Sequence, residues 1–246
     1  MAKVANLKVS LIIPAYNEEE RLGAFLKTIV TYWQRHRKEL REVLLVDDGS
    51  SDATVQVAKK WQKSLPIMKV IRHQKNRGKG AAVATGVLAA KGELIVFTDA
   101  DGATPIGELN KMIGVLGSSD VAVGNRWMKG ARTERRSSLR RFSGWVYRTY
   151  MRLFGLGGVD TMCGFKGYKR AVARDLFRGL LEERWLFDAE VAYKALRAGY
   201  TVVNFPIRWE SKDGSKLSTV TLIMSAFKIM PLMSKIRREI KATRKK

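Results

Sequence analysis

The sequence predicts an α/β fold with a mostly parallel central sheet flanked by helices. Short apolar runs typical of buried strands occur at 9–13, 42–46, 68–72, 94–98 and 121–124. Stretches typical of helices separate these runs, and such alternation favours parallel pairing through right-handed crossovers. The chain has 246 residues, 46% hydrophobic and 28% charged, so one large domain or two small ones can bury a sizeable core.

Start and stop signals set the expected bounds of the helices. The first strand is expected to stop at Pro14. Asn17 and Glu20 match a capping box, which predicts that a helix begins there. Asp52 is a good N-cap for the second helix. The predicted helices run over 17–35, 52–62, 81–90 and 108–116.

Composition narrows the kinds of site that the chain can build. Cys163 is the only cysteine, so an intramolecular disulfide is excluded. With only His36 and His73, a zinc site or a histidine-based triad is not expected, and both histidines are expected at the surface. We find no signal peptide and no run of 18 uncharged apolar residues, so no membrane span is expected. The net charge of +23 predicts an anionic partner: nucleic acid, an acidic membrane or a phosphorylated substrate.

Three of the predicted strands end in polar, turn-forming residues. These are 15–18, Asp47-Asp48-Gly49 and Asp99-Ala100-Asp101. Ligands in parallel sheets bind beyond the carboxyl ends of the strands, so the three clusters should meet at one edge. Asp99 and Asp101 suit Mg²⁺, which proteins usually hold with one or two carboxylates plus substrate phosphates. Such a pair taken alone more often caps a turn or a helix, but a structural need would not place five acidic residues at one edge.

Four motifs follow one another along the first half of the chain. They are Pro14-Ala-Tyr-Asn-Glu18, Val46-Asp-Asp-Gly-Ser50, Asn76-Arg-Gly-Lys-Gly80 and Asp99-Ala-Asp101. In this order and spacing they resemble the motifs of glycosyltransferase family 2 over about residues 8–126. The resemblance implies the GT-A fold, which binds a nucleotide sugar.

The resemblance also implies which residues bind the donor. The expected set is Pro14, Ala15, Tyr16, Glu18, Asp47, Asp48, Lys79, Asp99, Ala100, Asp101 and Lys216. The first four would line the uridine pocket, and Asp47 would bind the base or the ribose. Lys79 would reach the diphosphate or the base; the alternative is a solvated loop lysine. Asp99 and Asp101 would hold Mg²⁺ or Mn²⁺ on the diphosphate.

The second half of the chain resembles one branch of that family, the dolichyl-phosphate β-glucosyltransferases. The residues that carry this resemblance are Asp160-Thr-Met-Cys-Gly-Phe-Lys166, Arg184-Trp-Leu-Phe-Asp188-Ala-Glu190, Gly214-Ser-Lys-Leu217 and Asp99-Ala-Asp-Gly-Ala-Thr104. The related mannosyltransferases usually carry a glutamine and a proline pair after the metal motif, whereas this chain has only Pro105. The resemblance implies an inverting, metal-dependent transfer of glucose from UDP-glucose to a polyprenyl (dolichyl-type) phosphate, giving a β-linked product.

A polyprenyl phosphate brings its own nucleophile, because a phosphate monoester is mostly dianionic at pH 7. Arg126, Arg140 and Arg141 are the candidates for binding this phosphate, with Ser143 as a hydroxyl donor. Arginine suits this role because its planar fork donates two hydrogen bonds at once. The alternative is that Arg140 and Arg141 only contact lipid headgroups.

Asp188 resembles the acidic position that family 2 enzymes with hydroxyl acceptors use as a base. Here it would act as base or hold sugar hydroxyls; the alternative is a helix N-cap. Asp101, Asp188 and Arg126 are therefore the residues expected to act in catalysis. Lys216 would contact the diphosphate once its loop closes.

Two basic clusters account for most of the positive charge, one at 126–152 and one at 220–246. Residues 1–218 are expected to form the GT-A domain, and 219–246 an amphipathic basic segment lying in a membrane interface. Apolar residues such as Ile229 and Met230 would enter the acyl boundary; the alternative is a helix packed on the domain's own core. The protein is expected at the cytoplasmic face of a membrane, as a peripheral protein.

Two further functions stay open at this point. The same fold could use another donor, such as GDP-mannose or a UDP-N-acetylhexosamine. A function of another class is a non-catalytic basic module that binds membrane or nucleic acid. None of the common nucleic-acid-binding motifs appears, so no nucleic-acid partner is expected. The oligomeric state stays open.

Overall fold

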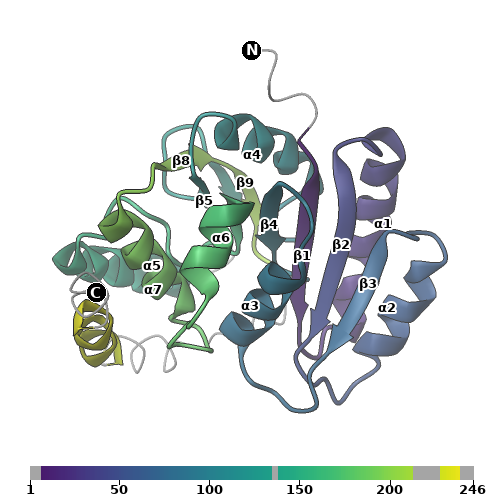
Figure 1. Ribbon diagram of the computed structural model, residues 1–246, viewed down its shortest axis with the longest axis horizontal. Coiled ribbons are helices and arrows are strands. Elements are labelled where there is room, and N and C mark those ends of the chain that lie inside the picture. The colour runs from purple at the N-terminus through teal and green to yellow at the C-terminus, as the bar shows by residue number, and fades with distance from the viewer. Residues whose placement is uncertain (1–6, 135–137, 213–227, 239–246) are drawn as a thin grey trace.

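A seven-stranded sheet with helices on both faces forms the centre of the protein in a computed structural model (Figure 1). The structure describes residues 7–134, 138–212 and 228–238. The strands lie in the order β3-β2-β1-β4-β7-β5-β8. They are β1 (Val9–Ala15), β2 (Leu40–Asp47), β3 (Met68–Arg72), β4 (Leu94–Thr98), β5 (Val121–Asn125), β7 (Phe165–Lys169) and β8 (Val202–Pro206). The predicted α/β architecture with a mostly parallel sheet is confirmed.

The α-helices α1 to α7 follow one another along the chain. They are α1 (Glu19–Arg35), α2 (Thr54–Gln62), α3 (Lys79–Ala89), α4 (Leu109–Leu116), α5 (Ser138–Met151), α6 (Arg170–Phe177) and α7 (Phe187–Ala198). Two short 3-10 helices, η1 (Ile106–Glu108) and η2 (Arg152–Phe154), precede α4 and follow α5. Two short parallel strands, β6 (Arg132–Glu134) and β9 (Arg208–Glu210), pair with each other in a separate small sheet. A further helix spans 228–238.

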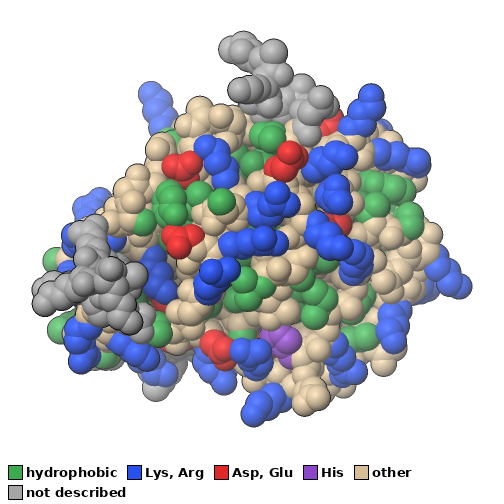
Figure 2. Space-filling model, viewed as in Figure 1, with side chains coloured by type: hydrophobic (Ala, Val, Ile, Leu, Met, Phe, Trp, Pro, Cys, Tyr) green, Lys and Arg blue, Asp and Glu red, His purple; other side chains and the backbone are tan. Residues whose placement is uncertain are grey.

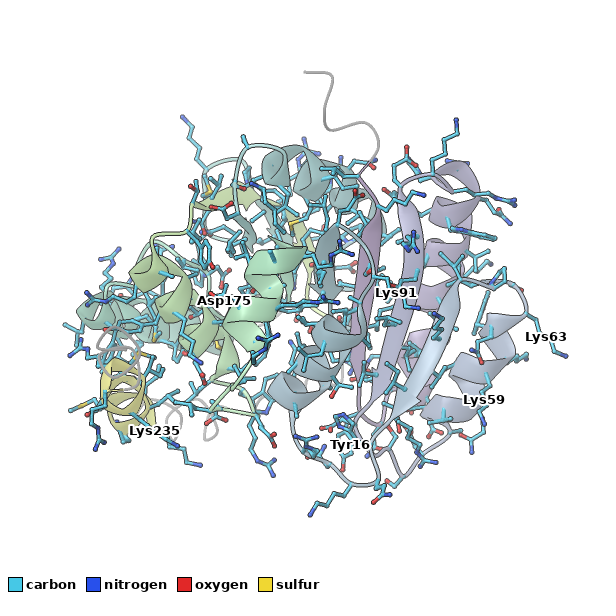
Figure 3. All side chains as sticks on the ribbon, in the orientation of Figure 1. Tyr16, Lys59, Lys63, Lys91, Asp175 and Lys235 are labelled. Carbon is cyan, nitrogen blue, oxygen red and sulfur yellow. The ribbon has the colours of Figure 1, made fainter. Side chains whose placement is uncertain are left out.

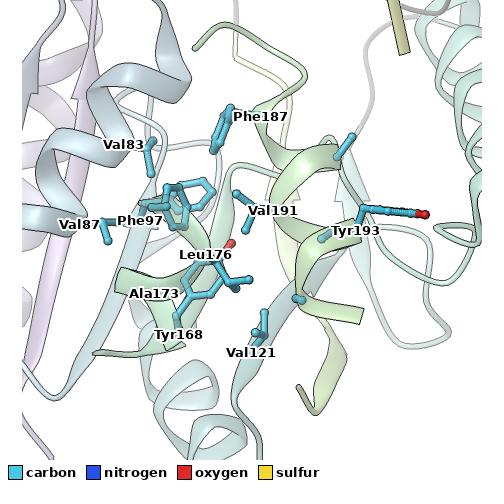
Figure 4. Close-up of a cluster of buried hydrophobic side chains, with 14 of the residues drawn as sticks. Val83, Val87, Phe97, Val121, Tyr168, Ala173, Leu176, Phe187, Val191 and Tyr193 are labelled. Atoms are coloured by element: carbon cyan, nitrogen blue, oxygen red, sulfur yellow. The ribbon is translucent and has the colours of Figure 1, made fainter. Parts of the chain in front are cut away.

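The two faces of the sheet bury two separate hydrophobic clusters, because side chains alternate along each strand. Leu11 and Ile13 of β1 pack with α1, α2 and α4, whereas Ile12 packs with α3, α5, α6 and α7. Figure 4 shows part of the cluster that contains Ile12, in which Phe97 of β4 lies close to Phe187 of α7. The face in Figure 2 carries many Lys and Arg side chains and few acidic ones, as expected for a net charge of +23.

The first strand does not stop at Pro14 but continues to Ala15. Pro14 aligns with Val46 of β2, while pairing with β4 on the other side ends at Ile12. A proline lacks an amide hydrogen, and here the ladder that would need it has already ended. The expectation that proline ends this strand is therefore wrong.

The predicted capping box is also wrong. The helix α1 begins at Glu19, and its N-cap, Glu18, makes no capping hydrogen bond through its side chain. Asn17 instead has a φ of 51° and accepts a hydrogen bond from the Ser51 amide. The side chain that was expected to cap the helix therefore links two loops at the edge of the sheet.

Strand β7 is the one strand of this sheet that runs against its neighbours. It lies between β4 and β5 and pairs with both in antiparallel register. Lys166 is level with Phe97, one residue before the end of β4. The antiparallel direction thus brings the start of β7 to the edge where the parallel strands end.

The helix at 228–238 packs against the domain, with Ile229, Met233 and Ile236 buried in the cluster that also holds Phe97 and Phe187. The expectation that Ile229 enters a membrane is therefore wrong, because the core occupies that face of the helix. Met230, on another face, is 63% exposed. The other parts of the predicted segment, 219–227 and 239–246, lie outside the described residues. Across the part of the chain that the structure describes, no helix has both the length and the apolar character needed to cross a membrane.

Candidate active site

The carboxyl ends of β1, β2 and β4 meet at one edge of the sheet, as predicted. Pro14 and Ala15 lie in register with Val46 and Asp47 of β2. Tyr16 follows them, is 36% exposed and lies at the lower edge in Figure 3. This places an aromatic ring where the first two strands end.

Glu18 is occupied by protein groups rather than directed to open solvent. Its carboxylate accepts hydrogen bonds from Arg21 Nε at 2.8 Å and Arg21 Nη2 at 2.7 Å. Its amide donates to Thr54 Oγ1 at 2.7 Å, and the neighbouring Asn17 amide donates to Ser50 Oγ. The turn after β1 is thereby tied to the turn after β2.

Asp47 is fully buried and has one carboxylate oxygen in use and one spare. Oδ2 accepts a hydrogen bond from the Ser50 amide at 3.2 Å and lies 3.2 Å from Arg72 Nε. Among the described residues, Oδ1 is buried and meets no hydrogen-bond partner. A buried acceptor without a partner is costly, so it indicates a place for a ligand's donor.

Asp48 differs from Asp47 because both of its oxygens bind protein groups. Oδ1 accepts from His73 Nδ1 at 2.7 Å and from the Arg77 amide at 3.0 Å. Oδ2 accepts from the Gly78 amide at 2.7 Å. His73 is buried, so the expectation that it lies at the surface is wrong: its two ring nitrogens join Asp48 to Thr85 of α3.

Lys79 is the first residue of α3, and it meets the carboxyl end of β4. Its Nζ lies 2.5 Å from Asp99 Oδ1 and 5.6 Å from the centre of the Trp185 ring. A side chain at Gly164 would collide with the Asp99 carboxylate, so glycine leaves the space that this carboxylate needs. The alternative of a solvated loop lysine does not hold, since the Lys79 side chain is largely buried.

The two acids of the Asp99-Ala100-Asp101 motif have opposite pKa shifts. Burial raises the pKa of Asp99, but Lys79, Lys166 and Arg126 outweigh it and leave that pKa lowered. Burial and the Asp99 charge raise the pKa of Asp101. Asp101 Oδ1 accepts a hydrogen bond from the Ala103 amide at 3.0 Å, while Asp101 Oδ2 lies 3.9 Å from Arg21 Nη1.

Asp188 stands in the first turn of α7 and pairs with a buried lysine. Its Oδ2 lies 3.1 Å from Nζ of Lys166, a residue that is only 2% exposed. Oδ1 is buried and meets no partner among the described residues. Burial raises the pKa of Asp188, although the Lys166 and Lys79 charges oppose that shift. Both residues line a cavity of about 10 Å³, room for about one water molecule.

Arg126 follows β5 and forms a two-pronged ion pair with Asp160. Its Nε and Nη2 each lie 2.9 Å from one oxygen of that carboxylate. Trp209 packs on the guanidinium, whose Cζ lies 5.2 Å from the ring centre. Arg126 also acts on the charge of Asp99, so it belongs to the same electrostatic group as Lys79.

Four predicted residues cannot be placed by their side chains. Arg140, Arg141 and Ser143 fall on α5, but their side chains lie outside the described residues, and so does Lys216. The sequence reasoning missed Lys166 as a member of the site. Lys166 lies on β7, a strand that the sequence analysis did not predict, so the rule that a buried lysine needs an acidic partner was not applied to it.

Comparison with known proteins identifies the family. The sequence model of the family described as "Glycosyl transferase family 2" matches residues 10–177 of this chain. The dolichyl-phosphate beta-glucosyltransferase of Drosophila melanogaster is 36% identical over 228 residues, which are 87% of this chain and 70% of that protein. The human protein of the same name is 32% identical over 225 residues, 85% of this chain and 69% of that protein.

Solved structures share the fold at lower identity. Glucosyl-3-phosphoglycerate synthase of Mycobacterium tuberculosis, solved with Mn²⁺, UDP and phosphoglyceric acid, is 17% identical with a TM-score of 0.69, covering 94% of this chain and 79% of that one. The mannosyltransferase of Pyrobaculum calidifontis, solved with GDP-Man and Mn²⁺, is 21% identical with a TM-score of 0.59, covering 85% and 59%. The fold is therefore the GT-A fold, and the chain is a glycosyltransferase that belongs to glycosyltransferase family 2.

Proposed function

We propose that the protein transfers glucose from UDP-glucose to a dolichyl-type polyprenyl phosphate, with inversion at the anomeric carbon. One observation carries the proposal: Asp47, Lys79, Asp99 and Asp101 meet at one sheet edge. The chain that does so is about one-third identical to dolichyl-phosphate beta-glucosyltransferases over nearly nine-tenths of its length. The acceptor phosphate is the nucleophile, attacking from the side opposite the departing UDP.

The nucleotide is assigned to the ends of β1 and β2. Asp47 Oδ1 accepts a hydrogen bond from an N–H of the base, which would satisfy the spare buried acceptor. The ring of Tyr16 stacks on the base from the adjoining strand end. Lys79 binds the diphosphate, for which it exchanges part of its contact with Asp99.

Asp99 and Asp101 fit a hard divalent cation, Mg²⁺ or Mn²⁺. Both offer carboxylate oxygens at the end of β4, and Asp99 has no side chain opposing it at Gly164. No group of three or more possible protein ligands occurs in the described ranges, so the diphosphate and water would complete the coordination. Such a cation supplies charge neutralisation for the departing diphosphate.

The acceptor phosphate is assigned to the basic residues that follow β5. Asp160 takes up Nε and Nη2 of Arg126, and we assign Nη1 to the acceptor phosphate. Arg140, Arg141 and Ser143, on α5, are proposed to complete this site. Asp188 then holds sugar hydroxyls through its spare Oδ1, because a phosphate nucleophile needs no enzymic base.

The lipid acceptor requires contact with a membrane, and α5 with η2 supplies an apolar surface for it. Trp145 and Leu153 are 56% and 75% exposed, whereas Tyr147 and Met151 of the same helix are buried. Met230 adds an exposed side chain from the helix at 228–238. We propose peripheral attachment at the cytoplasmic face, with the arginines of α5 contacting headgroups.

The donor and the class of function can be tested in one set of measurements. Release of UDP or GDP is measured for UDP-glucose, GDP-mannose and UDP-N-acetylglucosamine, each with a short polyprenyl phosphate and Mg²⁺ or Mn²⁺. The proposal expects turnover with UDP-glucose well above the others. A higher rate with another donor would make the chain a mannosyltransferase or an N-acetylhexosaminyltransferase. Absence of both turnover and metal-dependent thermal protection by UDP would favour a non-catalytic module.

The acceptor site is tested by removing two charges from α5. Arg140→Ala combined with Arg141→Ala should raise the KM for polyprenyl phosphate about tenfold or more, since each charge-assisted hydrogen bond contributes about 1.5–3 kcal/mol. The affinity for UDP should stay the same. Lys59→Ala with Lys63→Ala is the matched control, because it removes the same charge at the end of α2, on the opposite side of the molecule from α5 (Figures 1 and 3). Weaker UDP binding in the arginine variant would move these residues to the diphosphate site.

A further inference from the structure

The loop that carries Lys79 is enclosed on two sides by backbone. A side chain at Gly49 would strike the backbone of Lys75, and one at Gly80 would strike the backbone at Glu182 and Glu183. The Gly80 amide donates to the Arg184 carbonyl, and the Ala81 amide donates to the Glu183 carbonyl. The loop at 75–80 thus lies between the turn after β2 and the segment at 182–184.

Asp48 holds the loop from the side of the β2 turn. It accepts the amides of Arg77 and Gly78, the two residues immediately before Lys79. His73 donates to the same carboxylate and lies within 2.9 Å of Thr85 on α3. Gly78 has a φ of 116°, a conformation that favours glycine and that the Asp48 contact helps to fix.

Glu190 holds the opposite side in a similar way. It is fully buried, and its two oxygens accept the amides of Leu181 and Glu182 at 2.8 to 3.1 Å. Lys194 Nζ supplies a counter-charge at 2.6 Å. This carboxylate therefore fixes the segment that receives the amides of Gly80 and Ala81 and that carries Trp185 to Lys79.

We infer that Asp48 and Glu190 are a pair of positioning residues that hold Lys79 at Asp99 from opposite sides. This inference rests on the proposed function, in which Lys79 binds the donor diphosphate. It assigns the second aspartate of the Asp47-Asp48 pair to the loop rather than to the nucleotide, because protein groups occupy both of its oxygens. It also gives Glu190, two residues after Asp188, a role in donor binding without a contact to the donor.

The benefit of this arrangement is that the lysine is placed before the donor arrives. A flexible loop would lose conformational freedom on binding, and that loss would weaken the affinity. Asp48 and Glu190 pre-order the loop during folding, so the diphosphate meets Lys79 in position. Loosening either carboxylate should therefore weaken donor binding through Lys79 and through no other residue.

The experiment is a double-mutant cycle on the dissociation constant of UDP with Mn²⁺, measured by calorimetry. Asp48→Asn and Glu190→Gln each turn an amide group toward backbone N–H donors, and each should weaken UDP binding about tenfold, a loss of about 1.4 kcal/mol. In a Lys79→Met background the further loss should fall to about twofold or less. An equal loss with and without Lys79 would overturn the inference.

Two controls match the two variants. Glu42→Gln changes a buried carboxylate at the other end of β2 that also accepts a backbone amide, that of Lys91. Asp120→Asn changes a carboxylate that, like Glu190, accepts a backbone amide and pairs with a lysine. Both lie at the opposite edge of the sheet, so UDP affinity should stay within about twofold of the unchanged protein. A tenfold loss in either control would show a general effect of weakened packing and overturn the inference.

Hydrogen exchange at the Gly80 and Ala81 amides tests the clamp without any nucleotide. Neither amide binds Asp48 or Glu190 directly, and both should exchange faster in the two variants, because the partners of the loop have loosened. His73→Leu gives the same test if Asp48→Asn does not fold. Unchanged exchange in folded variants would overturn the positioning role. If Lys79→Met binds UDP as tightly as the unchanged protein, the proposed donor role of Lys79 fails instead.

Discussion

The two edges of the central sheet both carry buried carboxylates, yet they differ in how completely those carboxylates are bonded. At the edge where β2 begins, Glu42 Oε1 accepts from both Ser10 Oγ and the Lys91 amide at 2.7 Å. At the edge where β2 ends, Asp47 Oδ1 meets no partner. In the described residues, the buried polar side-chain atoms without a hydrogen-bond partner are this oxygen and Asp188 Oδ1, and both lie at the second edge.

The difference indicates which carboxylates serve the fold and which serve a ligand. Burying an unbonded acceptor costs about 1–3 kcal/mol, so folding alone would not retain one. A bonded carboxylate such as Glu42 stabilises its neighbours, whereas a spare oxygen such as Asp47 Oδ1 is kept for a donor group that arrives later. Substitution of the fully bonded Glu42 at the first edge should therefore reduce stability, and substitution of Asp47, which has a spare oxygen, should reduce function.

The largest expected effect is at the second edge. Asp101→Asn keeps the Oδ1 that accepts the Ala103 amide but removes the charge that would hold the cation. Turnover should fall about 10²- to 10³-fold, since a bound cation contributes several kcal/mol to departure of the diphosphate. The melting temperature should hardly change. Full activity in a folded variant at saturating Mg²⁺ would remove Asp101 from the metal site.

A second substitution at the same edge should separate function from stability. Asp47→Asn can keep the bond from the Ser50 amide while placing an amide donor where Oδ1 now stands without a partner. UDP affinity should fall about 100-fold, because a donor would face the N–H of the base. Stability should be unchanged or higher. Calorimetry with UDP and thermal unfolding check the two parts, and a large loss of stability would contradict the comparison.

The opposite result is expected at the first edge. Glu42→Ala leaves the Lys91 amide and the Ser10 hydroxyl without their acceptor, so the free energy of unfolding should fall by about 2 kcal/mol. UDP affinity should stay the same. Urea unfolding gives the first quantity and calorimetry the second. Loss of UDP affinity in a protein that is still folded would mean that the two edges are not independent.

The smallest effect concerns pH at the first edge. The hydrogen bond from the Thr201 amide is the largest cause that lowers the pKa of Asp120 in the folded protein, and the hydrogen bond from Lys169 adds to it. Its contribution to stability is therefore present above the unfolded pKa of about 4 and is lost as the pH falls through the folded pKa. The stability difference between the unchanged protein and Asp120→Asn should be greatest near neutral pH and shrink in acid. Melting temperatures from pH 7 to pH 3 give the test, and a constant difference would contradict it.

The sequence could predict the parts of the fold that depend on local pattern. Apolar runs placed the strands, and the polar residues that end β1, β2 and β4 placed the site edge, because parallel strands share a direction. It could not predict β7, since an antiparallel strand inserted between two others leaves no periodic signal. It therefore also missed that Lys166, on that strand, pairs with Asp188 of α7.

The sequence pattern also could not predict that adjacent residues have different roles. Asp47 and Asp48 are identical in type, and only three-dimensional contacts show that one keeps a spare oxygen while the other binds His73 and two amides. In the same way, Asn17 is of a residue type that often caps helices, but its side chain instead accepts a hydrogen bond from the amide of Ser51 in a distant loop. Long-range hydrogen bonds decided both cases.

The position of β7 has a consequence for how the polypeptide assembles as it is made. β5 and β8 join the sheet through β7, although β5 precedes β7 in the chain. Synthesis runs from the N-terminus, so β1 to β4 can pair early, while β5 must wait for a strand that emerges later. Until then the outer side of β4 is an open edge, able to pair with another nascent chain. A chaperone that covers apolar strand edges would have its greatest effect in that interval.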